Sequence, residues 1–131
     1  ITISGSPIEL VREMSIKHGF DAYIGSIYEL DANSCYTGGV IPMWDSKSKK
    51  AAIDSLIEKY DIDLSSSYAY GDTAGDFMML RLVGNPYAMN PTRELLSKIC
   101  HDDELKEKIH VVVERKDMIY QLTPSQLDLN I

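Results

Sequence analysis

Two aspartates spaced four residues apart, Asp72 and Asp76, are the residues whose pattern most directly predicts chemistry. They belong to segment 68–76, which reads as a short strand, a tight turn and the first turn of a helix. Two carboxylates that converge at such a corner cannot both stay ionised and unpaired without cost, and a bound divalent cation would resolve this. Hard oxygen ligands favour Mg²⁺. The alternative is structural: an Asp72-Thr73 helix cap followed by a surface aspartate, Asp76, in the first turn, which the helix dipole stabilises.

A second candidate site lies at Ser4 and Gly5, directly after the first apolar run of the chain. Hydroxyl groups and free backbone N–H groups ahead of a helix can form a cradle for an anion. The alternative is a simple helix start, with Ser6 as the N-cap and Pro7 in the first turn.

The third candidate is the basic start of the helix predicted at 48–60, where Lys47, Lys49 and Lys50 gather. A lysine at a helix N-terminus is unfavourable for the helix dipole, so an anion nearby would explain it. A solvated basic patch is the alternative. Each of these three patterns alone is weak, and their combination carries the prediction.

The elements that must position these residues alternate along the chain. Strands are predicted at 1–3, 22–27, 67–71, 86–89 and 110–113, a hairpin at 28–37, and helices at 7–17, 48–60, 77–82 and 92–99. This order predicts an α/β fold, a Rossmann-like three-layer α/β/α arrangement of a mainly parallel sheet with a small β-hairpin. Ligands bind such sheets at the carboxyl ends of the strands. The polar tail from about residue 123 is expected to be loosely held.

The bulk composition excludes several classes of protein. The chain has 131 residues, which suggests one domain, and a net charge of −7, which argues against nucleic acid or an anionic membrane as partner. No apolar run approaches the length of a membrane span. We expect a cytoplasmic protein in which Cys35 and Cys100 are free, partly buried thiols, with a disulfide as the alternative. The chain opens on a strand already under way, which suggests a fragment.

Taken together, the three patterns resemble motifs of the haloacid dehalogenase-like hydrolase superfamily. The Ser4 segment, the lysine at the start of the middle helix and the Asp72–Asp76 corner look like its second, third and fourth motifs, in the right order along the chain. Residues 70–80, with the segments around Asn85-Pro86 and Asn90-Pro91, are similar to the phosphoserine phosphatase-like branch. So are Ser4-Gly5-Ser6-Pro7 and Tyr36-Thr37-Gly38. The resemblance runs from residue 1 to about residue 100, and its fourth motif is the most specific.

The resemblance implies a role for each matching residue. Ser4, helped by the Gly5 N–H, would bind the transferring phosphoryl group of a small phosphorylated substrate. Lys49 would neutralise that group, and it is preferred over its neighbours because apolar residues then follow at the family's usual spacing. Asp72 would ligate Mg²⁺ directly, and Asp76 would act through a metal-bound water or by orienting Lys49. The implied activity is that of a Mg²⁺-dependent phosphomonoester hydrolase that forms an aspartyl-phosphate.

One departure from the family is large. Its first motif, Asp-x-Asp-x-Thr, which carries the nucleophile, is absent, and so is the cap that selects substrate. The nearest string, Asp61-Ile62-Asp63, falls in a connecting segment. The chain therefore looks like the C-terminal portion of an incomplete core domain, inactive alone. Its sheet would be split, and the gap would be filled by a second copy or by the missing N-terminal half. The alternative function is a non-catalytic relic that binds metal or phosphate, or an interaction module.

Overall fold

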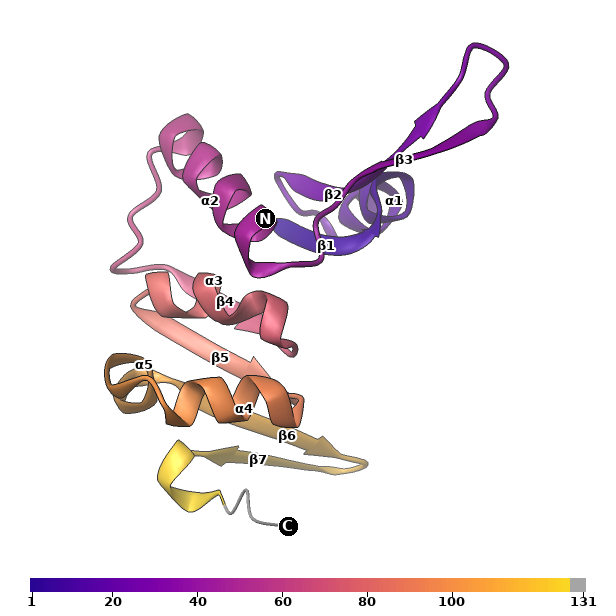
Figure 1. Ribbon diagram of the computed structural model, residues 1–131. Coiled ribbons are helices and arrows are strands. Elements are labelled where there is room, and N and C mark those ends of the chain that lie inside the picture. The colour runs from indigo at the N-terminus through magenta and orange to yellow at the C-terminus, as the bar shows by residue number, and fades with distance from the viewer. Residues whose placement is uncertain (128–131) are drawn as a thin grey trace. The chain divides into compact units, whose positions relative to one another are not determined.

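The structure is a computed structural model that describes residues 1–127, divided into two compact units, 1–52 and 53–131. The first unit contains β1 (Thr2–Pro7), α1 (Ile8–His18), β2 (Tyr23–Leu30) and β3 (Tyr36–Ile41). Helix α2 (Ser46–Tyr60) spans the boundary between the units. Figure 1 labels these elements.

The second unit alternates strands and helices. Its elements are β4 (Tyr68–Gly71), η1 (Ala74–Asp76), α3 (Phe77–Leu82), β5 (Asn85–Met89), α4 (Arg93–Cys100), α5 (Asp103–Lys108), β6 (His110–Arg115), β7 (Met118–Leu122) and η2 (Pro124–Gln126). Strands β4, β5 and β6 are parallel, and β7 returns antiparallel to β6. The predicted α/β fold with parallel strands is confirmed.

The strands form two sheets, β1-β2-β3 and β4-β5-β6-β7. In the first sheet β1 and β2 are parallel, and β2 and β3 form the predicted antiparallel hairpin. Strand β1 is an edge of one sheet and β4 is an edge of the other. The divided sheet agrees with the prediction, and each of these parallel edges has a neighbour on one side only.

The core of the second unit lies between its sheet and its helices. Leu80, Leu95 and Leu105, from α3, α4 and α5, pack with alternate strand residues such as Ala88 and Val111. Because these three helices contribute to one cluster, they lie on the same face of the sheet (Figure 1). Within residues 53–127, only one of the two helical layers expected for a Rossmann-like sheet is therefore present.

Most predicted elements are found, with shifted boundaries. Gly19 ends α1 with a φ of 71°, and the Thr92 hydroxyl caps α4 by accepting a hydrogen bond from the Leu95 N–H. The sequence analysis was wrong about the cap of α1. Strand β1 continues to Pro7, which occupies the N-cap position, so Ser6 belongs to the strand.

Two elements were missed, α5 and β7. Helix α5 is only six residues long and depends on the side chain of Asp102, which accepts a hydrogen bond from the Leu105 N–H. Among the described residues, strand β7 pairs with β6 alone, and its apolar residues Met118, Ile119 and Tyr120 are exposed rather than buried in a core. Its turn contains Lys116 with a φ of 45°.

The tail expected to be loose from residue 123 is partly ordered. Pro124 is buried in η2, and the N–H of Thr123 donates to the side chain of Gln126 at 2.8 Å. Residues 128–131 lie outside the described part of the chain. Both cysteines are free thiols, Cys35 exposed and Cys100 half-buried. Among the described helices, none combines the length and the apolar character needed to cross a membrane.

Candidate active site

The predicted metal corner lies in the second unit, at the carboxyl end of β4. Strand β4 ends at Gly71, and Asp72 and Thr73 form the turn before η1. The carboxylate of Asp72 belongs to an exposed residue, whereas Asp76 is buried, with 4% of its surface exposed. The two aspartates therefore occupy different environments, although the sequence presents them as a pair.

Asp76 acts as a brace for the turn. Its Oδ2 accepts hydrogen bonds from the backbone N–H groups of Asp72 and Thr73, each at 3.1 Å, and from the Thr73 hydroxyl at 3.2 Å. Three donors to one carboxylate oxygen stabilise its negative charge. Asp76 therefore has a structural task in the turn, but its burial differs from the surface position that the structural alternative assumed.

Gly71 is required at this corner for steric reasons. A Cβ added at position 71 would lie 2.5 Å from the Cβ of Asp76, closer than side chains approach. The backbone of β4 and the Asp76 side chain can meet only because position 71 has no side chain. The carbonyl of Asp72 also accepts a hydrogen bond from the Thr92 N–H at 2.8 Å, which ties the turn to the loop after β5.

The neighbouring loop is held by Asn90. Its N–H donates to the Val112 carbonyl at 2.7 Å, and its Oδ1 accepts from the Glu114 N–H at 2.8 Å. Asn90 has a φ of 45°, a left-handed conformation that asparagine tolerates well. The loop beside Asp72 is therefore fixed to β6 as well as to β5.

The predicted phosphate cradle lies in the first unit, on β1. The hydroxyl oxygen of Ser4 accepts a hydrogen bond from the Ser6 N–H at 3.2 Å. The pairing of β1 with β2 is irregular between Ile3 and Pro7, so this stretch departs from a regular ladder. A Cβ on Gly5 would lie 3.0 Å from the Cβ of Trp44, a tight contact that a side chain at position 5 could make only if Trp44 shifted.

Ser26 is a residue that the sequence analysis missed. It is fully buried; its hydroxyl donates to the Gly5 carbonyl at 2.8 Å and accepts from the Met43 N–H at 3.0 Å. Ser26 thereby fixes the backbone of the cradle at Gly5 and links it to Met43. A serine within the apolar strand that follows Tyr23 was the available signal, because a polar residue in a buried strand needs partners.

Lys49 is the buried member of the basic cluster. It is 7% exposed, whereas Lys47 is exposed and Lys50 is half-buried. A buried amine is retained only where charges or hydrogen-bond acceptors compensate it. This burial supports the preference for Lys49 over the other two lysines as the functional residue.

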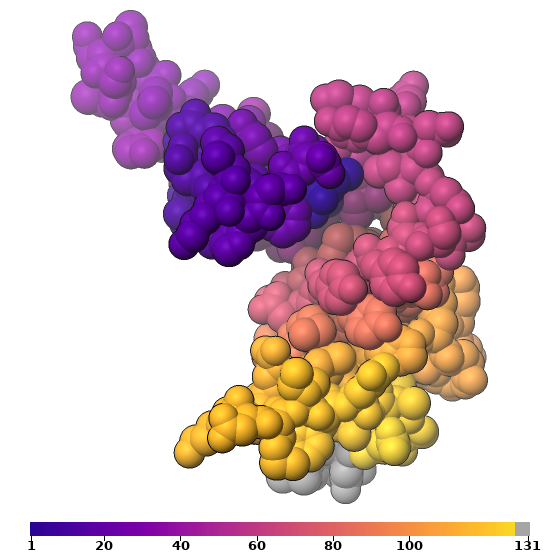
Figure 2. All heavy atoms as spheres, turned by 180° about the vertical axis from the view of Figure 1, so that it is seen from behind, coloured from indigo at the N-terminus to yellow at the C-terminus, as the bar shows by residue number. Residues whose placement is uncertain are grey.

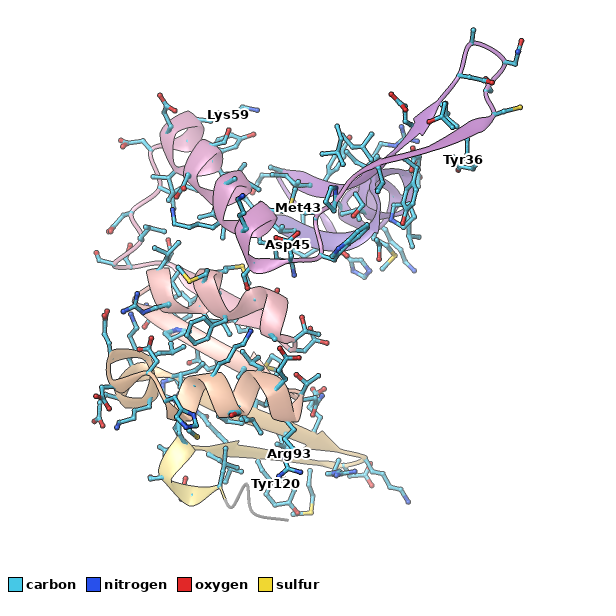
Figure 3. All side chains as sticks on the ribbon, in the orientation of Figure 1. Tyr36, Met43, Asp45, Lys59, Arg93 and Tyr120 are labelled. Carbon is cyan, nitrogen blue, oxygen red and sulfur yellow. The ribbon has the colours of Figure 1, made fainter. Side chains whose placement is uncertain are left out.

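Helix α2 begins two residues earlier than predicted, because Asp45 caps it. The Ser48 N–H donates to Asp45 Oδ1 at 2.9 Å and the Ser48 hydroxyl donates to Oδ2 at 2.8 Å. These hydrogen bonds lower the pKa of the Asp45 carboxyl. Asp45 lies at the first turn of α2 (Figure 3), where its charge also favours the helix dipole.

The string Asp61-Ile62-Asp63 is a connecting segment, as predicted. It lies between the end of α2 and the start of β4. The carboxylate of Asp63 accepts hydrogen bonds from the Ser65 hydroxyl at 2.6 Å, the Ser66 hydroxyl at 2.7 Å and the Ser65 N–H at 2.9 Å. These bonds lower the pKa of Asp63 to about 2. Asp63 organises a serine-rich turn.

The described residues contain a partial donor set for Mg²⁺. Within residues 1–127 no three His, Cys, Asp or Glu side chains gather closely enough to hold a metal ion. Asp72 fits as one ligand, because it is an exposed carboxylate at the carboxyl end of a parallel strand. Asp76 does not fit the direct-ligand role as well, because its Oδ2 already receives three hydrogen bonds.

Comparison with known proteins defines the class. Residues 1–81 match the model of the haloacid dehalogenase-like hydrolase family, so the chain belongs to that family. A protein of Streptomyces azureus named "Inhibition of morphological differentiation protein" is 35% identical over 95 residues, covering 72% of this chain and 34% of that protein. The phosphoserine phosphatase SerB1 of Mycobacterium tuberculosis is 29% identical over 96 residues, covering 72% and 31%.

Solved structures support the fold. A phosphoserine phosphatase in its apo form superposes with a TM-score of 0.63 at 21% identity, covering 74% of this chain and 49% of that one. A phospho-aspartyl intermediate analogue of phosphoserine phosphatase gives a TM-score of 0.62 at 20% identity, covering 88% and 51%. This chain spans about a third of the curated relatives and about half of these solved chains.

Proposed function

We propose that the chain is part of a Mg²⁺-dependent phosphomonoester hydrolase. It carries the phosphate cradle at Ser4 and Gly5 and the metal corner at Asp72. The observation that carries the proposal is the corner after β4, where Gly71 and Asp76 hold the turn so that the Asp72 carboxylate stands exposed at the strand's end. Membership of the haloacid dehalogenase-like family supports a hydrolase. The similarity to proteins named phosphoserine phosphatase supports a phosphate ester as the substrate.

Each candidate residue has a chemical task in this proposal. Ser4 and the Gly5 N–H bind phosphoryl oxygens, and Lys49 neutralises the charge of the phosphoryl group. Asp72 is a metal ligand, and bound Mg²⁺ would offset the charge that develops on the phosphoryl oxygens. Asp76 is a positioning residue, because its hydrogen bond to the Asp72 N–H sets the direction of the turn.

The covalent step requires a carboxylate that these 131 residues do not supply in the family's motif. We propose that an aspartate on another segment attacks phosphorus, the ester P–O bond breaks, and the leaving alkoxide takes a proton from an acidic group. Water then hydrolyses the acyl phosphate and releases inorganic phosphate. The similarity to a structure described as a phospho-aspartyl intermediate analogue supports this route.

The open strand edges suggest how the missing segment would attach. Strands β1 and β4 each end a sheet, and each has its other neighbour parallel. An unpaired parallel edge is a template for another strand. We propose that a strand bearing the nucleophile pairs with one of these edges, supplied by a longer gene product or by a separate polypeptide.

The test begins with the chain alone, assayed with Mg²⁺ and p-nitrophenyl phosphate. We expect no turnover. Addition of a polypeptide that carries an Asp-x-Asp-x-Thr segment, encoded upstream of Ile1, should restore turnover, and Asp72→Asn should abolish it. Turnover by the chain alone that survives Asp61→Asn and Asp63→Asn but is lost with Asp72→Asn would overturn the idea of an external nucleophile.

A non-catalytic module is the second candidate function. The three hydrogen bonds that Asp76 accepts give it a structural task in the turn, and such a task is compatible with a module that binds a ligand without catalysis. Isothermal titration with Mg²⁺ and inorganic phosphate separates the candidates when combined with the complementation assay. Binding without restored turnover, together with a start codon at Ile1, would favour the module.

A further inference from the structure

The side chain of Asn90 completes the parallel ladder between β5 and β6. The Asn90 N–H donates to the Val112 carbonyl at 2.7 Å, one rung beyond the strand pair Met89–Val112. In a continued parallel ladder, the next rung would join the Glu114 N–H to the main-chain carbonyl of Asn90. The Glu114 N–H donates instead to the side-chain oxygen of Asn90, at 2.8 Å. The side-chain carbonyl of Asn90 therefore replaces its main-chain carbonyl as the acceptor.

The backbone conformation of Asn90 explains this replacement. Its φ of 45° is left-handed, and the chain leaves β5 here to reach Pro91 and the start of α4. Asparagine adopts this conformation more readily than most residues, because its short polar side chain can hydrogen-bond locally. Glycine would tolerate the same φ but has no side-chain acceptor for Glu114. Position 90 therefore uses both properties of asparagine.

A second hydrogen bond joins the Asn90 side chain to β6. Its Nδ2 donates to Glu114 Oε2 at 3.3 Å, so a single residue of β6 binds both ends of the amide. Beyond Glu114 the chain leaves the sheet in the turn before β7, and Figure 2 shows this turn, in golden orange, projecting from the second unit. These contacts lie at the carboxyl end of β6, which is also the end of the sheet where Asp72 follows β4.

The loop that Asn90 anchors binds Asp72 two residues later. The Thr92 N–H donates to the Asp72 carbonyl at 2.8 Å. The Asp72 N–H in turn donates to the Asp76 carboxylate at 3.1 Å. The N–H and the carbonyl of Asp72 are therefore both fixed, one by its own turn and the other by the loop after β5. Since the backbone sets the direction of the Cα–Cβ bond, these two hydrogen bonds limit where the Asp72 carboxylate can lie.

We propose that Asn90 is a positioning residue for Asp72 and acts through Thr92. The inference rests on the proposed function, in which Asp72 is a ligand of Mg²⁺. Removing a group that orients a metal ligand typically lowers metal affinity by about 10- to 100-fold. Mg²⁺ demands near-ideal octahedral geometry, so a displaced carboxylate binds it poorly. Loss of the Asn90 side chain should therefore weaken Mg²⁺ binding by about tenfold or more.

The first measurement follows the link itself in the 131-residue chain. Amide hydrogen exchange, measured by NMR, reports the protection of the Thr92 N–H by the Asp72 carbonyl. Asn90→Gly keeps the left-handed φ and removes the acceptor for Glu114. We expect exchange at Thr92 to accelerate about tenfold, since two hydrogen bonds of the loop are lost. Unchanged exchange at Thr92 would overturn the proposal, because the loop would then hold Asp72 without Asn90.

The second measurement is the Mg²⁺ concentration that half-activates the complemented enzyme. Asn90→Gly should raise this concentration about tenfold, with a smaller change in kcat at saturating Mg²⁺. A variant in which Thr92 exchanges faster but the Mg²⁺ requirement is unchanged would also overturn the proposal. Asn90 would then only close the turn ahead of Pro91.

Asn85→Gly is the matched control, at the amino end of the same strand. The Asn85 Nδ2 donates to the Ser67 carbonyl at 3.3 Å, so this variant also removes an asparagine hydrogen bond from β5. It should lower the Tm, while exchange at Thr92 and the Mg²⁺ requirement stay as in the unmodified chain. Equal effects of Asn85→Gly and Asn90→Gly on the Mg²⁺ requirement would assign the effect to general weakening of β5, against the proposal.

A rescue experiment tests the pairing of Asn90 with Glu114. Asn90→Asp keeps an acceptor for the Glu114 N–H but places a carboxylate beside the Glu114 carboxylate. Exchange at Thr92 should therefore accelerate. Adding Glu114→Gln returns an amide donor to the pair, so the double variant should recover most of the protection at Thr92. A double variant that exchanges as fast as Asn90→Asp would contradict the link through Glu114.

The Mg²⁺ titration also separates this inference from the proposed function. If complementation yields no Mg²⁺-dependent turnover, the proposed function fails and the inference fails with it. If turnover depends on Mg²⁺ and Asn90→Gly leaves that dependence unchanged, the proposed function stands and only the role of Asn90 is lost.

Discussion

The backbone N–H of Asp72 donates a hydrogen bond to the buried carboxylate of Asp76, with 3.1 Å between the Asp72 nitrogen and Asp76 Oδ2. One aspartate therefore fixes the turn, and the other presents its side chain to solvent. The two aspartates differ because of burial. A buried carboxylate needs hydrogen-bond donors from the protein, whereas water solvates an exposed carboxylate. Substitutions at Asp76 should therefore change stability, whereas substitutions at Asp72 should change the chemistry of the proposed site.

Asp76→Ala should destabilise the chain. The variant leaves two backbone N–H groups of the turn without their acceptor, and an unsatisfied buried donor costs roughly 1–3 kcal/mol. Urea denaturation followed by circular dichroism measures the loss in free energy of unfolding. Asp72→Asn is the control, because an exposed side chain usually changes stability by less than about 0.5 kcal/mol. Equal destabilisation by both variants would contradict the assigned roles.

Acid should weaken the serine-rich turn through Asp63. Its folded-state pKa of about 2 lies below the value of an unfolded aspartate, near 3.9, so the carboxylate stabilises the fold above pH 4. That contribution is lost as the pH falls from about 4 to about 2, where the folded state must also take up the proton. NMR titration of the Asp63 carboxyl carbon should give a midpoint near 2.

Asp63→Asn should remove this part of the pH dependence and lower the Tm at neutral pH. Asp61→Asn is a matched control, because Asp61 is exposed with a φ of 50°, a conformation in which asparagine is at least as favourable. A Tm that is lowered equally by the two substitutions would show that the serine hydrogen bonds to Asp63 do not stabilise the turn.

Lys49→Met should abolish phosphate chemistry, on the proposed function. In the complemented enzyme we expect kcat/KM for p-nitrophenyl phosphate to fall by about 10²-fold or more, since the variant removes a cation from the phosphoryl site. Lys47→Met serves as the control, because Lys47 is exposed on the same helical turn. Full activity of Lys49→Met would exclude Lys49 from the site.

The short helix α5 should depend on its cap. Asp102 accepts a hydrogen bond from the Leu105 N–H at 2.9 Å and pairs with Arg81 Nε at 2.8 Å, and both interactions lower the pKa of the Asp102 carboxyl. Asp102→Ala should cost about 1 kcal/mol of stability, the usual value of an N-cap. Asp103→Ala, at an exposed neighbouring position, should change the urea midpoint little. A larger effect at Asp103 would contradict this account.

Residues with strong local signals were located correctly from the sequence. Gly19 and Thr92 mark helix ends because a left-handed conformation and a capping hydroxyl are local requirements. The family motifs also predicted the class of protein, which the match over residues 1–81 confirms. Boundaries that depend on partners were less accurate, as at Pro7, where pairing with Ser26 extends the strand.

The sequence by itself determined the alternation of strands and helices, the family and the strand-to-helix corner that carries Asp72 and Asp76. Local propensity and motif spacing are sufficient for these, because they involve residues close together in the chain. Only the tertiary structure decided that Asp76 is buried as a brace while Asp72 is exposed, that Ser26 supports the Gly5 backbone, and that the Asn90 side chain accepts a hydrogen bond from the Glu114 N–H. Burial and strand pairing depend on residues far apart in the sequence, and spacing alone does not contain them.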